Sequence, residues 1–520
     1  MRTSCVLAAV GLLLVPACRA ASSAKVIAAA ATSSSPGAAT AICLLKTDCT
    51  GWWSPGSLDS GANEGIYVQL ESTIDADVVE FTTNAKDATR NFNVSVNGAL
   101  VAAPATTRPI SGDEYVARYT VPGGHVKSVF LRLSVLLGGR RNFRVFAVRF
   151  FEKGSPISLI LPVLVPASVT ASSVLEPKVA YQPANLFDSR YDFAWSTNGQ
   201  ATSGKGEWIE IKFDQPQDLS GIVVWNGYQR SEEHFKANGR VAKMTATAGD
   251  VSNNFVLGVS RMGSQQVTFA QPMKSTSSVK LTIDDVTPGA KYPDVLLSEL
   301  RFVDSHGQVL IPQVKGVAPD VNAAISEIVD QSLSSVVCAA AQGDADPESE
   351  FQRSLRLRRD GSFVIYNNDV TYEERQTKNN DQVLEGNWES RGSEIRIFGQ
   401  RYTDTIVSSD YSQATRRVPP SIFQSDLTIA RFHDLSLAEQ TQLASLILSR
   451  VYRESKGVSN QVVTIYGPGY ERLAQGTGEK ALVASLVNRL GGLNPWTLRS
   501  PILADAMLPS DDVGSCGGSN

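Results

Sequence analysis

A run of polar and aromatic residues between positions 226 and 240 is the part of the sequence best suited to ligand binding. The segment reads NGYQRSEEHFKANGR, and its candidate binding residues are Asn226, Tyr228, Arg230, Glu232, His234, Lys236 and Arg240. Carbohydrate recognition uses a flat aromatic ring that stacks on sugar C–H groups, together with charged donors and acceptors for vicinal hydroxyls. A solvated loop with paired charges has the same composition, so these residues alone leave both interpretations open.

A second candidate is the stretch NLFDSRYDFAWSTNGQATSGKGEWIEIKF at residues 185–213, which sets acids and two tryptophans around a glycine-rich turn. It is compatible with a catalytic loop, a metal site, a sugar-binding rim or the corner of a β-sandwich. Catalytic signals elsewhere are weak, because no histidine lies beside a nucleophile motif and the sequence contains no GxSxG or HExxH motif. We therefore expect a protein that is not an enzyme.

The composition is that of a folded protein with several domains. The chain has 520 residues, of which 42% are hydrophobic and 19% are charged, and this length exceeds what one core usually supports. A net charge of -4 gives no electrostatic reason to expect a nucleic acid partner.

The N-terminus is similar to a bacterial export signal. Residues 1–18, MRTSCVLAAVGLLLVPAC, combine one positive charge, an apolar run and small residues before Cys18. The ending LVPAC resembles a lipobox, in which the cysteine is acylated, although Pro16 departs from the common pattern and plain secretion is the alternative. The small residues of 19–40 predict a flexible tether. We expect an outer-membrane lipoprotein, or a protein of the periplasm or cell surface, attached to the membrane by a lipid on Cys18.

Cysteine spacing agrees with export. Cys43 and Cys49 are close enough in the sequence to close a small disulfide loop. Cys338 and Cys516 either form a second disulfide or are unrelated thiols.

An internal repeat organises the first two thirds of the chain. Two alternating runs joined by a polar turn occur at residues 206–226, and the same pattern with the same spacing occurs at residues 65–84. Residues 279–307 and 129–154 each repeat a strand, a glycine-containing loop and a second strand. Short strands without helical periodicity predict two tandem jelly-roll β-sandwiches, at residues 41–160 and 166–315.

The remaining residues predict a C-terminal α+β module, so the expected fold class is mainly β. Apolar spacing predicts a helix at 319–341, and strict alternation with a DG turn at Asp360 predicts an antiparallel β meander at 350–407. Residues 420–520 predict an α+β unit whose first helix begins at Ser436, where Glu439 completes a capping box.

The second sandwich resembles the discoidin, or coagulation factor type C (F5/8), superfamily. The resemblance rests on NLFDSRYDFAW, GEWIEIKF and LLSELRFVD, and the run NGYQRSEEHFKANGRVAKM is similar to the glycan-binding domain described for NAD glycohydrolase translocation. It covers about residues 166–310, is weak over the first sandwich, and is absent beyond. The resemblance implies an eight-stranded jelly roll that binds carbohydrate or lipid headgroups with loops at one end.

The resemblance also implies a structural calcium site. The positions that match the calcium ligands of the family are Asp188 and Glu299, with Asp192 nearby, and Ca²⁺ prefers such oxygen ligands. However, the second loop acid of the family falls on Arg190, so the alternative is an Arg190 salt bridge that holds the loop closed. In the first sandwich Ala147 takes the position of Glu299, and no metal is expected there.

These features together predict an exported, lipid-anchored cell-envelope protein. We expect it to bind a glycan, such as an envelope polysaccharide, through the second jelly roll, while the first is a degenerate copy that serves as a spacer. Two alternatives are targeting domains attached to a C-terminal enzyme, and a scaffold for protein interactions.

Overall fold

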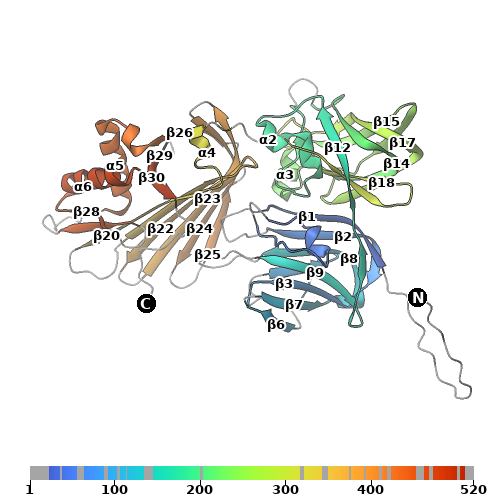
Figure 1. Cartoon of the computed structure of the whole chain (residues 1–520), viewed down its shortest axis with the longest axis horizontal. Coiled ribbons are helices and arrows are strands. Elements are labelled where there is room, and N and C mark those ends of the chain that lie inside the picture. Colours follow the sequence, from blue (N-terminus) through green and yellow to red (C-terminus); the bar gives the residue numbers. More distant parts are fainter. Residues whose placement is uncertain are drawn as a thin grey trace, which may run out of the picture.

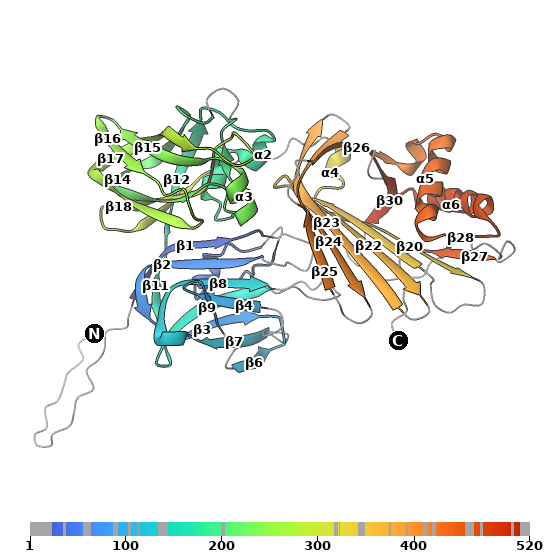
Figure 2. The ribbon, with the colours of Figure 1, turned by 180° about the vertical axis from the view of Figure 1, so that it is seen from behind.

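The computed structural model consists of two β-sandwiches and a C-terminal domain built on one long curved sheet (Figures 1 and 2). It describes residues 23–509, apart from 35–37, 56–63, 87–91, 102–105, 113, 134–143, 199–202, 317–320, 322, 342–348, 374–375, 392–393, 409–412, 419–422, 453–461, 468–471 and 501–503. Strands predominate, as the sequence predicts. Cys18 and Cys516 lie outside the described residues.

The first sandwich packs a six-stranded sheet, in the order β11-β1-β2-β8-β4-β5, on a five-stranded sheet, in the order β10-β9-β3-β7-β6. The elements are β1 (Ser23–Ala31), η1 (Cys43–Leu45), β2 (Gly65–Asp75), β3 (Val78–Thr83), β4 (Phe92–Val96), β5 (Ala99–Leu100), β6 (Thr106–Ser111), β7 (Glu114–Thr120), η2 (Pro122–Gly124), β8 (His125–Leu133), β9 (Val145–Glu152), β10 (Ser155–Pro156) and β11 (Ser158–Ile160).

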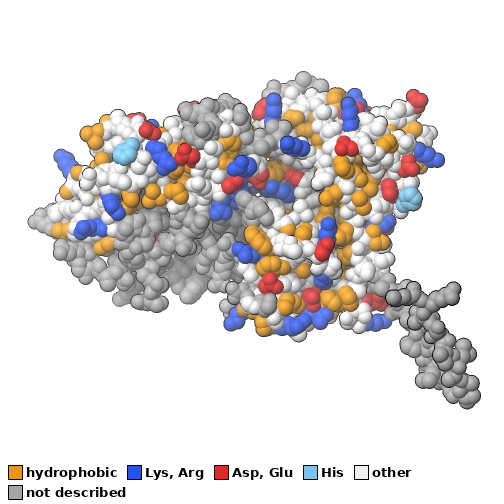
Figure 3. Space-filling view, in the orientation of Figure 1, with side chains coloured by type: hydrophobic (Ala, Val, Ile, Leu, Met, Phe, Trp, Pro, Cys, Tyr) orange, Lys and Arg blue, Asp and Glu red, His pale blue; other side chains and the backbone are white. Residues whose placement is uncertain are grey.

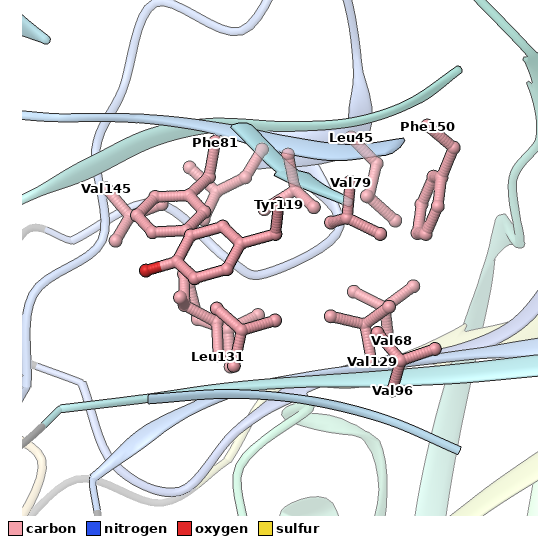
Figure 4. Close-up of a cluster of buried hydrophobic side chains, with 14 of the residues drawn as sticks. Leu45, Val68, Val79, Phe81, Val96, Tyr119, Val129, Leu131, Val145 and Phe150 are labelled. Atoms are coloured by element: carbon pink, nitrogen blue, oxygen red, sulfur yellow. The ribbon is translucent and has the colours of Figure 1, made fainter. Parts of the chain in front are cut away.

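The core of this sandwich consists of the inward-facing residues of both sheets. Figure 4 shows two layers of side chains that face each other. One layer contains Phe81 and Tyr119, and the other contains Val129 and Leu131. The rings of Phe81 and Tyr119 stack with their centroids 5.4 Å apart. This arrangement follows from the period-two alternation of buried and exposed residues along β3 and β8.

The prediction of a flexible tether at 19–40 is wrong for residues 23–31. These residues form β1, which pairs with β2 and β11 and is buried along most of its length. The alanine run reads as a linker in sequence, but its small side chains permit close packing on both faces. One face joins the core of the first sandwich, and on the other Ala28 and Ala30 contact Trp225 and Tyr191 of the second sandwich. The first sandwich therefore begins at least eighteen residues before the predicted boundary at 41.

The strands of the second sandwich form one eight-stranded sheet, in the order β13-β18-β19-β12-β14-β17-β15-β16. The long strands of this sheet bend and so contribute to both layers of the sandwich. Its elements are β12 (Val163–Ala171), α2 (Lys178–Tyr181), η3 (Pro183–Phe187), β13 (Trp195–Ser196), β14 (Trp208–Asn226), α3 (Glu232–Ala237), β15 (Arg240–Ala248), β16 (Val251–Val256), β17 (Ser264–Thr287), β18 (Leu296–Asp304) and β19 (Val309–Gln313).

The strand pairings confirm the internal repeat. β12 pairs in parallel with β19 and antiparallel with β14, just as β1 pairs in parallel with β11 and antiparallel with β2. The later half of β14 pairs with β17 and β18, and β3 has the equivalent partners β7 and β9. Both sandwiches thus share one topology, which agrees with a jelly roll in tandem copies.

The C-terminal domain is one continuous sheet that carries two helices on one part of its surface (Figure 1). Its elements are α4 (Ala323–Ser326), β20 (Ser332–Ala341), β21 (Ser349–Leu357), β22 (Ser362–Glu373), β23 (Gln376–Arg391), β24 (Glu394–Ser408), β25 (Gln413–Val418), β26 (Phe423–Arg431), η4 (Phe432–Asp434), α5 (Leu437–Val451), β27 (Val463–Tyr466), β28 (Arg472–Gly476), α6 (Glu479–Leu493), β29 (Trp496–Arg499) and β30 (Ala504–Pro509).

Two predictions for this domain need correction. The helix expected at 319–341 is limited to α4, and Ser332–Ala341 forms β20, because pairing with β21, β27 and β30 overrides a local apolar spacing that fits either structure. The meander at 350–407 and the α+β unit at 420–520 are not separate, since β24 pairs with β26 and β20 pairs with β27 and β30. The capping box at Ser436 and Glu439 is confirmed.

The described residues include the predicted disulfide between Cys43 and Cys49. Cys338 is also disulfide-bonded. None of the helices in the described part of the chain is long and apolar enough to cross a membrane.

Candidate ligand-binding site

The segment predicted to bind sugar lies at one end of the second sandwich, beside α2. Residues 226–240 leave β14, form the short helix α3 and enter β15. Ser231 caps α3 by accepting a hydrogen bond from the backbone N–H of His234. The segment is therefore an ordered turn with a helical centre rather than an extended loop.

Three of the predicted binding residues belong to the framework of this turn. Asn226 is 1% exposed and holds the segment together, because its amide donates to the carbonyls of Val241 and Gly258 and accepts from the backbone N–H of Val241. His234 is buried against the ring of Tyr228, with ring centroids 5.1 Å apart. Asn226 and His234 thus hold the turn together, and ligand contact by these two residues stays a prediction.

Arg240 is the third framework residue. Its guanidinium donates to the backbone carbonyls of Phe235, Asn238 and Pro288, and it stacks on the Phe235 ring at 5.0 Å. Glu232 and Lys236 lie on the exposed face of α3, where they form an i,i+4 ion pair at 3.1 Å. For Glu232 and Lys236, the structure therefore shows the second interpretation that the sequence left open, a solvated segment with paired charges.

Tyr228 and Arg230 belong to a different group, which the sequence alone did not reveal. Tyr181 of α2 packs on Tyr228, and Tyr292 and Asp294 lie close enough to influence the ionisation of Tyr181. We call Tyr181, Tyr228, Arg230, Tyr292 and Asp294 the tyrosine cluster. Tyr181 ends α2 two residues before Pro183, and Tyr292 directly precedes Pro293, so an aromatic residue close to a proline is the signal that identifies them in retrospect.

The electrostatics of the tyrosine cluster favour neutral rings beside one cation. Burial raises the pKa of Tyr181 well above its ordinary value, and the nearby Tyr228 and Asp294 add to this effect. Burial also raises the pKa of Tyr228, while the charge and hydrogen bond of Arg230 oppose the rise. The Tyr228 hydroxyl donates to the backbone carbonyl of Asp192 at 2.8 Å. The cluster thus offers aromatic faces, phenolic hydroxyls and a guanidinium within one surface region.

The predicted calcium residues lie beneath this end of the sandwich, and they are already bound to arginines. Arg301 pairs with Glu299 at 2.6 Å, and both side chains are almost completely buried. The backbone N–H of Arg190 donates to Asp188 Oδ1 and Glu299 Oε1 at 2.8 and 2.7 Å. The guanidinium of Arg190 binds both carboxylate oxygens of Asp192.

This arrangement does not fit calcium. The two buried guanidiniums supply the positive charge that the carboxylates require, and a divalent cation beside them would be repelled. Among the described residues, no group of three or more His, Cys, Asp or Glu side chains is placed to hold a metal ion. The structure instead contains the Arg190 salt bridge, which the sequence analysis gave as the alternative to a calcium site.

A calcium titration tests this interpretation. We expect 1–5 mM Ca²⁺, roughly the range of weak extracellular sites, to leave the thermal unfolding of the second sandwich unchanged, and EDTA to have no effect. The control is the Arg190→Ala variant, in which the repelling guanidinium is absent. A calcium-dependent rise in the unfolding temperature of the parent protein would contradict the interpretation.

The buried carboxyl pair predicts a pH dependence of stability. Burial raises the pKa of Glu299 to about 7, and burial together with the Glu299 charge raises the pKa of Asp188 well above its ordinary value. Because the folded state retains protons that the unfolded state releases, the stability gained is complete below about pH 4 and is lost as pH rises through about 7. Thermal unfolding followed by circular dichroism should give a lower melting temperature at pH 8 than at pH 5. Asp188→Asn should flatten this dependence, and an unchanged slope would contradict it.

The strand order, the shared topology and the loops at one end define the second sandwich as a discoidin-like jelly roll. Residues 163–303 match the family model described as the NAD glycohydrolase translocation F5/8 type C domain, so this part of the chain carries that domain. The match confirms the resemblance inferred from NLFDSRYDFAW and LLSELRFVD. It supports carbohydrate binding or a translocation-related role at the level of the domain.

Solved structures that match this chain include three kinds of protein. The tandem CBM32 domains of Clostridium perfringens ZmpB are 10% identical and cover 53% of this chain and 92% of theirs, with a TM-score of 0.20. Allantoicase from Saccharomyces cerevisiae is 12% identical and covers 53% of this chain and 90% of its own, with a TM-score of 0.18. The arabinofuranosyltransferase AftD from Mycobacteria is 10% identical and covers 93% of this chain, with a TM-score of 0.21.

The chain spans 44% of the AftD chain and 37% of a ZmpB chain that includes the M60 catalytic domain. At these TM-scores the similarities carry no argument about activity. No curated protein matches the sequence.

Proposed function

We propose that this protein binds carbohydrate, without catalysis, through the tyrosine cluster of its second sandwich. The observation that supports this proposal most strongly is the placement of Tyr181, Tyr292 and Arg230 at one end of a discoidin-like domain. The half-buried rings of Tyr181 and Tyr292 offer apolar faces to sugar C–H groups, and a tyrosine hydroxyl can donate or accept a hydrogen bond. Arg230 adds the planar donors that suit vicinal hydroxyls.

The framework around the cluster favours binding to a preformed site. Tyr228 is fixed by its hydrogen bond to Asp192, and the turn that carries Arg230 is fixed by Asn226 and the cap at Ser231. A site built from such rigid elements loses little conformational entropy when it binds a ligand. Asp294 accepts hydrogen bonds beside the rings, and its burial raises its pKa.

We also propose that the protein is exported and acts in the cell envelope, with a lipid on Cys18 as its membrane anchor. Three disulfide-bonded cysteines, Cys43, Cys49 and Cys338, support an oxidising compartment. The ligand proposed for this location is an envelope polysaccharide or another surface glycan. A shift in electrophoretic mobility when signal processing is inhibited with globomycin tests the anchor, and a mobility that never changes argues against it.

A glycan array with the whole chain tests the binding proposal. We expect a restricted set of glycans to bind, and the best of them to bind Arg230→Ala and Tyr292→Ala at least about tenfold more weakly by calorimetry. Lys236→Ala is the matched control, because Lys236 lies on the exposed face of α3, where its ammonium pairs with Glu232. Folded protein that binds no glycan on the array, or variants that bind as tightly as the parent, would refute the proposal.

A further inference from the structure

The loop at residues 188–192 contacts all three domains of the chain. It belongs to the second sandwich, but its backbone extends the pairing of β1 from the first. Ala31 donates its backbone N–H to the carbonyl of Ser189 at 2.9 Å, and the backbone N–H of Tyr191 donates to the carbonyl of Ala31 at 2.9 Å. Figures 1 and 2 both place β1 along the underside of the second sandwich. The first sandwich is thus joined to this loop by backbone hydrogen bonds.

The side chain of Arg190 reaches in the other direction, to the C-terminal domain. Its Nε and one terminal nitrogen bind Asp192 at 2.9 and 2.6 Å, and its other terminal nitrogen binds Asp360 at 2.8 Å. The guanidinium also lies over the Phe193 ring at 4.4 Å. All three guanidinium nitrogens therefore have an acidic partner, and one of these partners is on another domain.

Asp360 occupies the tight turn between β21 and β22. Its Oδ1 accepts from the backbone N–H and hydroxyl of Ser362, so one carboxylate oxygen organises the turn while Oδ2 binds Arg190. The Arg190 guanidinium and the Ser362 hydrogen bonds outweigh burial and hold the pKa of Asp360 at about 2. Figure 3 shows acidic and basic side chains gathered along the seam between the C-terminal domain and the second sandwich.

We propose that Arg190, Asp192 and Asp360 form an interdomain clasp that fixes the C-terminal domain against the ligand-binding end of the second sandwich. A planar guanidinium suits this role because its rigid fork binds Asp192 with two nitrogens and leaves a third for a partner on another chain segment. The side chain of Arg190 is 16% exposed and that of Asp360 is 32% exposed. Such shielding makes the contact stronger than an ordinary surface ion pair.

The clasp also lies next to the tyrosine cluster. Asp192 contributes its side chain to Arg190 and its backbone carbonyl to the Tyr228 hydroxyl. Asp192 therefore links the clasp to the tyrosine cluster, and the clasp fixes the C-terminal domain in position next to that cluster. This inference does not depend on which ligand the site takes, or on whether it binds carbohydrate at all.

Asp360→Asn in the whole chain is the sharpest test. The asparagine retains an oxygen for Ser362, so the turn is preserved, but it removes the charge that pairs with Arg190. We expect small-angle X-ray scattering to give a radius of gyration that is roughly 5–10% larger than that of the parent, because the C-terminal domain is released. Arg190→Met should give the same expansion from the other side of the contact.

Asp330→Asn is the matched control. Asp330 forms an ion pair at 3.1 Å with Arg359, the residue that precedes Asp360 in the sequence. Both members of this pair lie within the C-terminal domain, so it does not connect two domains. The control should scatter like the parent, and circular dichroism should show that all variants are folded. Parent-like scattering of Asp360→Asn would refute the clasp, even if Arg190→Met were unfolded, because Asp360 lies outside the second sandwich.

Discussion

Arg301→Met should destabilise the second sandwich by about 3–5 kcal/mol, because it removes one partner of a buried ion pair and leaves several buried acceptors without a donor. Arg301 and Glu299 are 2% and 0% exposed, and their charged groups lie 2.6 Å apart. The guanidinium also donates to the carbonyls of Leu186 and Leu300 and to the hydroxyl of Ser189. Methionine fills a similar volume but satisfies none of these acceptors.

Tryptophan fluorescence during denaturant unfolding is the appropriate measurement. Trp195, Trp208 and Trp225 lie in this sandwich, while Trp52, Trp53, Trp388 and Trp496 lie in the other two domains, so the transition of the second sandwich is the one that shifts in Arg301→Met. Lys236→Met is the control, since it breaks an exposed ion pair and should cost no more than about 0.5 kcal/mol. Replacing Glu299 by methionine in the Arg301→Met background should recover part of the loss. A loss for Arg301→Met no larger than the control would show that the buried pair does not stabilise the fold.

The repeated strands were predictable because their information is local. Ile209, Ile211 and Phe213 alternate with polar residues along β14, and the structure buries all three. The same alternation recurs along β2 at Ile66, Val68 and Leu70. A half-buried strand requires this pattern wherever it occurs, so two copies with equal spacing imply two copies of one fold.

The elements that were missed depend on partners distant in the sequence. The alanines of β1 have no alternation, and their burial results from the second sandwich packing on one face and the first on the other. Leu333 and Val337 of β20 have a helical spacing, yet both are buried in a sheet whose partner strands lie up to about 170 residues away. Local sequence does not encode such pairings.

The binding residues predicted from the sequence and the tyrosine cluster lie at the same end of the second sandwich, but only Tyr228 and Arg230 belong to both sets. The run from Asn226 to Arg240 has suitable side chains, and folding turns Asn226 and Arg240 inward to bind carbonyls. Tyr181 of α2 and Tyr292 are more than one hundred residues apart in sequence, so no local motif includes both. Arg190, whose charge set the calcium prediction in doubt, binds the acids of the loop and connects the domains.

Asp505→Ala should have a comparable effect on the C-terminal domain, with a loss of about 3–5 kcal/mol, because Asp505 neutralises two arginines in the interior. Asp505 is 0% exposed and lies 3.2 Å from Arg353 of β21 and 2.6 Å from Arg450 of α5. Ser335 of β20 donates to its other oxygen at 2.9 Å. One carboxylate thus attaches α5 to three neighbouring strands, β30, β20 and β21. Burial lowers the pKa of Arg353 to about 10 even with this partner, so removing Asp505 leaves that charge in an unfavourable environment.

Hydrogen exchange distinguishes this role from general packing. Without Asp505, the amides of α5 should exchange faster than those of β23 and β24, because the helix loses its ionic attachment while the central strands keep their pairing. Asp505→Asn should be less destabilised than Asp505→Ala, since the amide retains an acceptor for Ser335. Asp426→Asn is the matched control: it removes an exposed ion pair with Arg396 on the same sheet and should cost far less stability than Asp505→Ala. If Asp505→Ala unfolded at the same denaturant concentration as this control, the buried network would have no net stabilising role, and the docking of α5 would rest on its apolar face alone.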